Sequence, residues 1–370
     1  MSGAVGEQTT LAERKRRAGQ RIFVGFHGHA VSEDLRKLVR EVGPSGFVLF
    51  ARNVASPEQV RELNRELASL VPDSHPAFLA VDQEGGRVQR IREPATRFPP
   101  MRTLGAAKNL TADVSRAMAI ELRAMGFNLN FAPVADVDSN PDNPVIGDRS
   151  FSRDPKAVGE HVAAFIRAHQ AEFVMACAKH FPGHGDTNTD SHHTLPTVDR
   201  SAHSLRQTEL PPFRAAIAAG VATIMTSHVV YPAWDETFPA TMSETIINGL
   251  VRKELGYDGL IFSDDLEMKA VRGRYTAEEQ VMCMTRATVD VLLCCDRQDV
   301  QMEVFEAAVR AQEINPGAHH NTELSVARLD ALRKRAFLLP DGRPIPPPPG
   351  LEVIGQHRAL VERIREVASR

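Results

Sequence analysis

The chain has few cysteines and few large aromatic residues for its length. Its 370 residues include four cysteines, one tryptophan and three tyrosines. Cys294 and Cys295 are neighbours, so a disulfide between them would be strained. The chain also has no CxxC pair of the kind that binds zinc or carries redox chemistry. We therefore expect reduced thiols and a cytoplasmic protein.

Long apolar runs and an excess of one charge are also missing. No apolar stretch approaches the roughly 18 residues of a transmembrane helix, and residues 1–17 lack the apolar core of a signal peptide. The formal net charge of −3 provides no field that would attract nucleic acid or an anionic membrane. The basic run RKRR at 14–17 has no interleaved aromatic residues and is expected to lie on a solvated first helix. The sequence thus predicts neither nucleic-acid nor membrane partners.

What the sequence does contain is a series of short apolar runs separated by amphipathic stretches. Continuous apolar runs are typical of parallel strands that are covered on both faces. The eight candidate strands are Ile22–Phe26, Gly46–Phe50, Ala77–Val81, Asn128–Ala132, Val174–Ala178, Ala222–Thr226, Gly259–Ser263 and Val289–Leu293. Eight such units predict an α/β fold of the (β/α)₈ TIM-barrel type, with an open doubly wound sheet as the alternative.

Helix signals lie between these runs. Ser56 and Asp154 each precede a proline at a first helical position, where a short polar side chain caps the free backbone N–H groups. Gln59 is expected to complete a capping box with Ser56. A third helix is predicted over Glu323–Phe337.

The composition changes after residue 340. Residues 344–349 read PIPPPP, which predicts a stiff spacer. Beyond it, apolar residues from Ile354 to Val367 recur at helical spacing. We predict a barrel domain over 1–340, followed by a spacer and final helix over 341–370. This helix is expected to dock on the barrel or on a second subunit, so a monomer and a homodimer both fit.

Polar residues follow five of the predicted strands, where an α/β barrel carries its working residues. They include Asp82-Gln83-Glu84, Asp136, Asp138 and Arg149, Lys179-His180, Ser227-His228, and Asp264-Asp265. The alternative is that strand ends are simply solvated and therefore polar. Five clusters in equivalent positions favour an active site over that alternative. Two of these residues have structural alternatives: Asp82 as a helix cap, and Arg149 as an ion-pair partner of Asp148 or Asp154.

The segment KHFPGHGDTNTDSHH at 179–193 concentrates the most chemistry. Asp190 and His192 are two residues apart, so on an extended segment they lie on the same side, where the carboxylate can orient the imidazole for acid/base work. A metal site is the alternative reading. Its candidate ligands are His180, His184, Asp186, His192 and His193. Against it, Lys179 would repel a cation, and Pro182 and Gly183 break any helix between the first two histidines.

Asp264 and Asp265 end the seventh predicted strand. Side chains alternate along a strand, so only one of the two acids can point into the barrel mouth, and periodicity does not choose between them. A carboxylate facing an acid/base group across the mouth is the geometry of glycoside cleavage. A histidine in the second role departs from the usual pair of carboxylates.

At these segments the chain resembles glycoside hydrolase family 3, most closely its single-domain bacterial β-N-acetylglucosaminidases of cell-wall recycling. The matching stretches are GFVLFARN (46–53), VDQEGGRVQR (81–90), NFAPVADVD (130–138), KHFPGHGDTNTDSHHTLP (179–196), MTSHVVYP (225–232) and GLIFSDDLEM (259–268). They follow the family order and span nearly the whole predicted barrel.

The resemblance implies a role for each matching residue. Asp264 matches the nucleophile, His192 the acid/base and Asp190 its partner. Contacts to the terminal N-acetylglucosamine are implied for Asp82, Arg90, Arg149, Lys179 and His180. The implied substrate is a muropeptide that carries N-acetylglucosamine on 1,6-anhydro-N-acetylmuramic acid, cleaved without a metal or other cofactor. The alternatives are a metal-dependent barrel hydrolase and a broader β-glucosidase.

Overall fold

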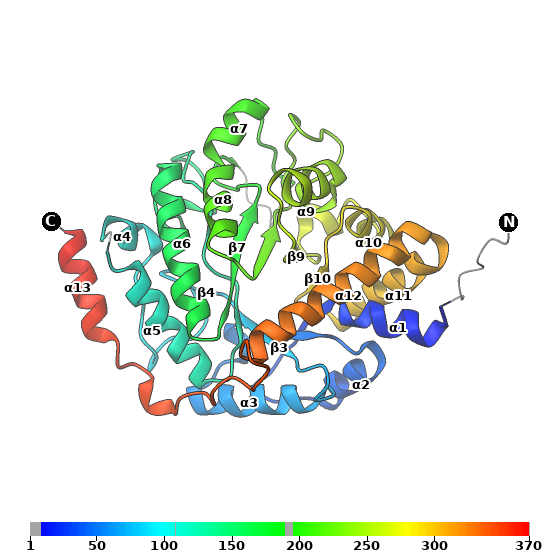
Figure 1. The fold of residues 1–370 in the computed structure, drawn as a ribbon, viewed down its shortest axis with the longest axis horizontal. Helices are drawn as coiled ribbons and strands as arrows, with labels where there is room; N and C mark the ends of the chain where they lie inside the picture. The colour runs from blue at the N-terminus through cyan, green and yellow to red at the C-terminus, as the bar shows by residue number, and fades with distance from the viewer. Residues whose placement is uncertain (1–8, 108, 189–194, 370) are drawn as a thin grey trace.

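The computed structural model describes residues 9–107, 109–188 and 195–369. Within these ranges, eight parallel strands form a closed barrel in the order β1-β10-β9-β8-β7-β6-β3-β2 (Figure 1). They are β1 (Ile22–Gly25), β2 (Gly46–Leu49), β3 (Phe78–Val81), β6 (Leu129–Asn130), β7 (Met175–Phe181), β8 (Thr223–Thr226), β9 (Leu260–Asp265) and β10 (Val291–Cys294). Each overlaps one predicted strand, so the barrel is confirmed and the open sheet is excluded.

Helices surround the barrel (Figure 1). Those of the described residues are α1 (Leu11–Gln20), α2 (Glu33–Val42), α3 (Pro57–Ser69), α4 (Met101–Ala106), α5 (Thr111–Ala124), α6 (Pro155–Ala171), α7 (Ala202–Thr208), α8 (Leu210–Ala218), α9 (Lys269–Arg272), α10 (Ala277–Arg286), α11 (Gln298–Ile314), α12 (Pro316–Phe337) and α13 (Arg358–Ala368). A π-helical segment, Thr245–Glu254, follows β8. A short antiparallel hairpin, β4 (Gln83–Gly85) and β5 (Val88–Gln89), follows β3.

Polar side chains cap the helices near the predicted starts. The side chains of Ser56 and Asp154 cap α3 and α6, as expected. The predicted capping box is wrong in detail, because the Gln59 side chain accepts a hydrogen bond from the backbone N–H of Ala55. The third predicted helix begins earlier, at Pro316, because Asn315 caps it there.

Apolar side chains pack in two layers. One lies between the strands and the helices, and the other fills the barrel interior. Leu329, Leu332 and Ala336 of α12 join the interior layer, and the ring of Phe337 lies 6.0 Å from that of Phe78, the first residue of β3. Helix α12 therefore closes the end of the barrel where the strands begin, which leaves the opposite end for a site.

The chain after α12 runs along the outside of the barrel to α13, which lies beside α4 (Figure 1). On the way, the Arg123 side chain of α5 donates hydrogen bonds to the carbonyls of Pro346 and Pro347. Val361 and Ile364 of α13 are buried. The final helix thus docks on its own barrel.

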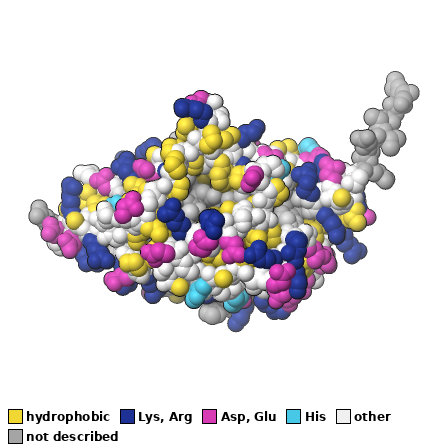
Figure 2. Space-filling model, turned by 90° about the horizontal axis from the view of Figure 1, so that it is seen from below, with side chains coloured by type: hydrophobic (Ala, Val, Ile, Leu, Met, Phe, Trp, Pro, Cys, Tyr) yellow, Lys and Arg dark blue, Asp and Glu magenta, His cyan; other side chains and the backbone are white. Residues whose placement is uncertain are grey.

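Acidic and basic side chains are interspersed over the face that Figure 2 shows. This mixture agrees with the small net charge of the chain. Among the described residues, no helix combines the length and the apolar character that crossing a membrane would require.

Candidate active site

A cavity of about 210 Å³ lies at the ends of the barrel strands. Six of the predicted site residues line it together: Asp82, Arg90, Arg149, Lys179, His180 and Asp264. The predicted acid/base pair, Asp190 and His192, lies outside the described residues. The cavity walls also contain Met225 and Met268, with further apolar side chains that include Val48 of β2, Phe131 just after β6 and Leu293 of β10.

Strand alternation explains how three of these side chains reach the cavity. On β3, β7 and β9, alternate residues belong to the interior layer. These rows are Phe78 and Ala80, Met175 and Cys177, and Leu260 and Phe262. The next position in each row is charged: Asp82, Lys179 and Asp264. Because side chains two residues apart share a face of a strand, the packing that fills the barrel also directs these three charges into its mouth.

The ammonium group of Lys179 is held between two carboxylates. Its Nζ lies 2.7 Å from Asp82 Oδ1 and 2.6 Å from Glu84 Oε1. Glu84 in turn receives two hydrogen bonds from Arg149, both of 2.8 Å. Arg90 completes the cluster at 3.2 Å from Asp82. Ion pairs of this kind fix the relative positions of the loops that carry them.

Burial and pairing oppose each other in this cluster. The Glu84 side chain is only 1% exposed, and burial alone would raise its pKa, but Arg149 and Lys179 outweigh that effect and hold the pKa below its usual value. The same balance lowers the pKa of Asp82 through Lys179 and Arg90. For Lys179, burial lowers the pKa, but the two carboxylates raise it above its usual value. All three groups are therefore charged at neutral pH.

The sequence interpretation placed Glu84 among the strand-end polar residues but gave it no role in the site. Glu84 lines the cavity and binds both Lys179 and Arg149. The alternative that pairs Arg149 with Asp148 or Asp154 is wrong, because Asp148 lies near Arg87 and Asp154 caps α6. The available signal was the spacing of Asp82 and Glu84, which places both acids on one face of an extended chain.

His180 is oriented by Asp136, a fully buried acid after β6. Its Nδ1 lies 2.7 Å from Asp136 Oδ2, and the backbone N–H groups of His180 and His184 donate to Oδ1. Burial opposes ionisation of Asp136, but His180 outweighs it and lowers the pKa. With Nδ1 occupied, Nε2 is the His180 nitrogen that a ligand can use. The pKa of His184 falls to about 4 because of burial and the neighbouring His180.

The two acids at the end of β9 differ in their surroundings. Asp265 Oδ1 accepts hydrogen bonds from the backbone N–H groups of Glu267 and Cys295, both of 3.2 Å. Burial raises the pKa of Asp265 to about 7, although the hydrogen bond from the Glu267 backbone N–H acts in the opposite direction. Asp264 follows the inward row of β9, and its Oδ1 accepts only the N–H of Asp265 among the described residues. Among the described residues, Asp264 therefore accepts fewer hydrogen bonds than Asp265.

Comparison with known proteins places this geometry in a family. Residues 15–329 match the model of the glycosyl hydrolase family 3 N-terminal domain. The chain belongs to glycoside hydrolase family 3. The β-hexosaminidase of Neisseria meningitidis serogroup C (strain 053442) is 39% identical over 286 residues, covering 75% of this chain and 78% of that relative.

Solved structures of the same family are also similar. The family 3 β-N-acetylglucosaminidase of Paenibacillus sp. str. FPU-7 has a TM-score of 0.86 and 38% identity, over 98% of this chain and 69% of that one. Native NagZ from Neisseria gonorrhoeae has a TM-score of 0.71 and 32% identity, over 84% of this chain and 97% of that one. The resemblance inferred from the sequence is confirmed, and the chain is a family 3 β-N-acetylhexosaminidase.

Glu209 is a further buried acid in the hexosaminidase, and it lies next to Gly183, the second residue after β7. Glu209 accepts a hydrogen bond of 3.1 Å from Ser139. Gly183 has a φ of +136°, and a Cβ at that position would lie 2.3 Å from Glu209 Oε2. Tyr231 donates its hydroxyl to the Gly183 carbonyl. The close contact requires glycine here, so Glu209 is in direct contact with the start of this loop.

We predict that Glu84→Gln weakens the hexosaminidase without unfolding it. The amide keeps the shape of the side chain but removes the charge that Lys179 and Arg149 share. A displacement of these groups by about 1 Å would lower kcat/KM by about 100-fold. Steady-state kinetics with an aryl N-acetylglucosaminide, alongside circular dichroism, measures this effect. Glu160→Gln, an exposed change on α6, is the matched control, and equal kinetics for both variants would contradict the prediction.

Glu209 gives a prediction about pH. Burial, followed by the charge of Asp136, raises the pKa of Glu209 to about 8. The pKa of a glutamate in the unfolded chain is about 4.3. The stability contributed by the neutral acid is therefore fully present below about pH 4 and is lost as the pH rises towards 8. Glu209→Gln stays neutral throughout, so its Tm relative to the wild type should rise between pH 5 and pH 9. A constant Tm difference would mean that Glu209 is already ionised at pH 5.

Proposed function

We propose that the enzyme is a retaining exo-β-N-acetylglucosaminidase. In this proposal it removes terminal N-acetylglucosamine from muropeptides that carry 1,6-anhydro-N-acetylmuramic acid, during peptidoglycan recycling in the cytoplasm. The observation that carries the catalytic part is the inward row of β9, which ends with Asp264 beside a ring of charged side chains. Relatives named β-hexosaminidase and β-N-acetylglucosaminidase support the choice of sugar.

The small size of the cavity supports an exo mode of action. It measures about 210 Å³ and is walled by charged groups at the strand ends. Sugar hydroxyls both donate and accept hydrogen bonds, so carboxylates and cations around a single ring can hold it in one orientation. We assign this role to Asp82, Arg90, Arg149, Lys179 and His180. The remainder of the substrate then lies outside the cavity.

The proposed reaction is a double displacement. The Asp264 carboxylate attacks the anomeric carbon, and the bond to the leaving oxygen breaks as His192 protonates that oxygen. His192, oriented by Asp190, then removes a proton from water, which attacks the same carbon and releases Asp264. Two inversions leave the sugar with its original β-configuration. Lys179 and Arg149 hold the sugar while both steps occur.

Asp264→Asn should lower kcat by about 1,000-fold or more, because an amide does not form the glycosyl-enzyme. Asp265→Asn is the matched comparison, since the amide oxygen still accepts a backbone N–H and a smaller loss is expected. His192→Ala should affect a disaccharide substrate more than an aryl glycoside, whose leaving group needs little protonation. Equal losses for the two aspartate variants would contradict the choice of Asp264.

Two assays separate this proposal from its alternatives. A broader β-glucosidase would hydrolyse p-nitrophenyl β-glucoside at a rate comparable to that of the N-acetylglucosaminide, whereas we expect little glucosidase activity. A metal-dependent hydrolase would lose activity with EDTA, whereas we expect no loss. Within the described ranges, no three His, Cys, Asp or Glu residues are arranged to hold a metal ion.

A further inference from the structure

The hairpin β4–β5 presents Glu84 to the cavity, and its flanks carry Asp82 and Arg90. Two-stranded hairpins are marginally stable by themselves, so their position depends on what lies behind them. Behind this hairpin lies the segment 91–100, called the backing loop below. The position of the hairpin therefore depends on the contacts that hold the backing loop.

Two buried glutamines join the hairpin to the backing loop. Gln89 donates to the carbonyl of Thr96 at 2.8 Å and accepts the N–H of Phe98 at 3.1 Å. Gln83 donates to the carbonyl of Ile91 at 2.9 Å, while its own oxygen accepts the N–H of Arg90 at 2.9 Å. A shift of the backing loop would therefore be transmitted to Arg90.

Glu121 of α5 joins the backing loop to the C-terminal segment. Its carboxylate accepts the N–H of Thr96 at 2.9 Å and the Thr96 hydroxyl at 2.6 Å. It also accepts the N–H of Gly355 at 3.1 Å and lies 2.9 Å from Nδ1 of His357. Glu121 is buried, and a buried carboxylate that loses donors is costly. Donors from both segments are thus needed to satisfy it.

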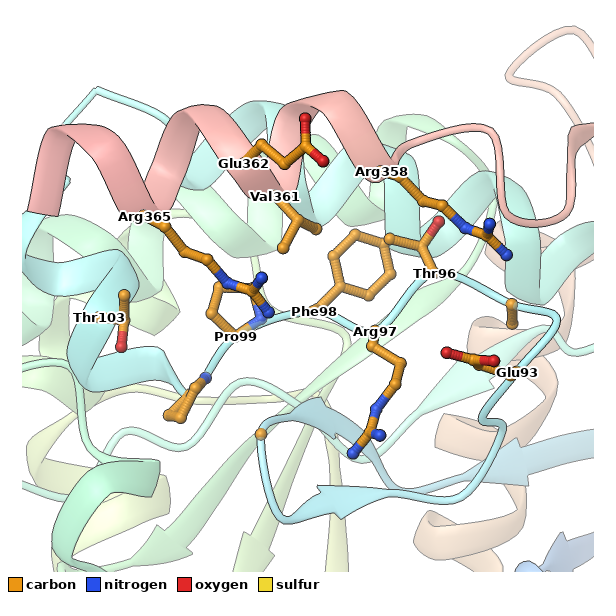
Figure 3. A pocket seen from close by; sticks show the side chains of 13 residues that line it. Glu93, Thr96, Arg97, Phe98, Pro99, Thr103, Arg358, Val361, Glu362 and Arg365 are labelled. Carbon is orange, nitrogen blue, oxygen red and sulfur yellow. The ribbon is translucent and has the colours of Figure 1, made fainter.

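The C-terminal segment also contacts the backing loop directly. Gly355 has a φ of +76°, and a Cβ there would lie 2.4 Å from the carbonyl oxygen of Pro94. Figure 3 shows Val361 of α13 directed towards Phe98 of the backing loop. A groove of about 670 Å³ remains between α13 and the backing loop, and the contacts of Gly355 and His357 lie at the start of the C-terminal segment.

We propose that the C-terminal segment, residues 350–364, positions the sugar-binding hairpin through Glu121 and the backing loop. This segment lies beyond the family match, which ends at residue 329. Gly355, His357 and Glu121 are positioning residues in this account, since the contacts above connect them to Arg90 only through other residues. The inference rests on the proposed roles of Asp82 and Arg90 in binding the sugar.

The test uses the full chain with Gly355→Ala and His357→Ala. For each we expect KM for p-nitrophenyl N-acetyl-β-glucosaminide to rise about tenfold, while kcat changes less than about twofold. His357→Ala removes a hydrogen-bond partner of the Glu121 carboxylate, and a Cβ at position 355 would displace the Pro94 carbonyl of the backing loop. Arg363→Ala is the matched control, because Arg363 lies exposed on α13 and its side chain has no hydrogen bond or ion pair among the described residues. A lower Tm with unchanged KM in both variants would overturn the inference.

Hydrogen exchange monitored by mass spectrometry tests the same contacts without relying on activity. Residues 83–98 should exchange faster in Gly355→Ala and His357→Ala than in the wild type or in Arg363→Ala. Unchanged exchange over this stretch in both variants overturns the inference, whatever the kinetics show. Absence of wild-type turnover with the N-acetylglucosaminide would instead count against the proposed function, so the two failures are distinguishable.

Discussion

The contact on which the site depends is the ammonium group of Lys179 between the carboxylates of Asp82 and Glu84. Burying any one of these charges alone would cost several kcal/mol, so each is stable in place only with the others. Arg149 extends the same network from a third loop. Strand β7, which carries Lys179, and the segments after β3 and β6 are thereby tied to one another at the point where a sugar would bind.

Three sets of contacts, at increasing distance from the cavity, hold this network in place. The interior rows of β3, β7 and β9 place the charges, and α12 closes the far end of the barrel. The buried carboxylate of Asp136 holds the start of the β7 loop by two backbone N–H groups and the His180 ring. Outside the strands, Glu121 ties the loop behind the hairpin to the C-terminal segment. The outermost segment of the chain is thus in contact with the surroundings of the site.

The sequence predicted the barrel because each buried parallel strand is a short apolar run with its own local signal. It also predicted the strand-end charges, because alternation and the barrel architecture place them in advance. The pairing of Glu84, by contrast, was not predicted, since its partner Arg149 is 65 residues away. Periodicity also left Asp264 and Asp265 open as the nucleophile, and the assignment to Asp264 came from the family resemblance. The structure adds that the backbone N–H of Cys295, just after β10, donates to Asp265. Such partners are set by tertiary packing, which periodicity does not encode.

The central claim is that Asp264 forms a covalent bond with the sugar. A 5-fluoro-N-acetyl-β-glucosaminyl fluoride tests it most directly, because the ring fluorine slows hydrolysis of the glycosyl-enzyme while the good leaving group lets it form. Peptide mapping by mass spectrometry should find the added sugar on Asp264. A label on Asp265 or on any other residue, or inactivation without a label, would contradict the account.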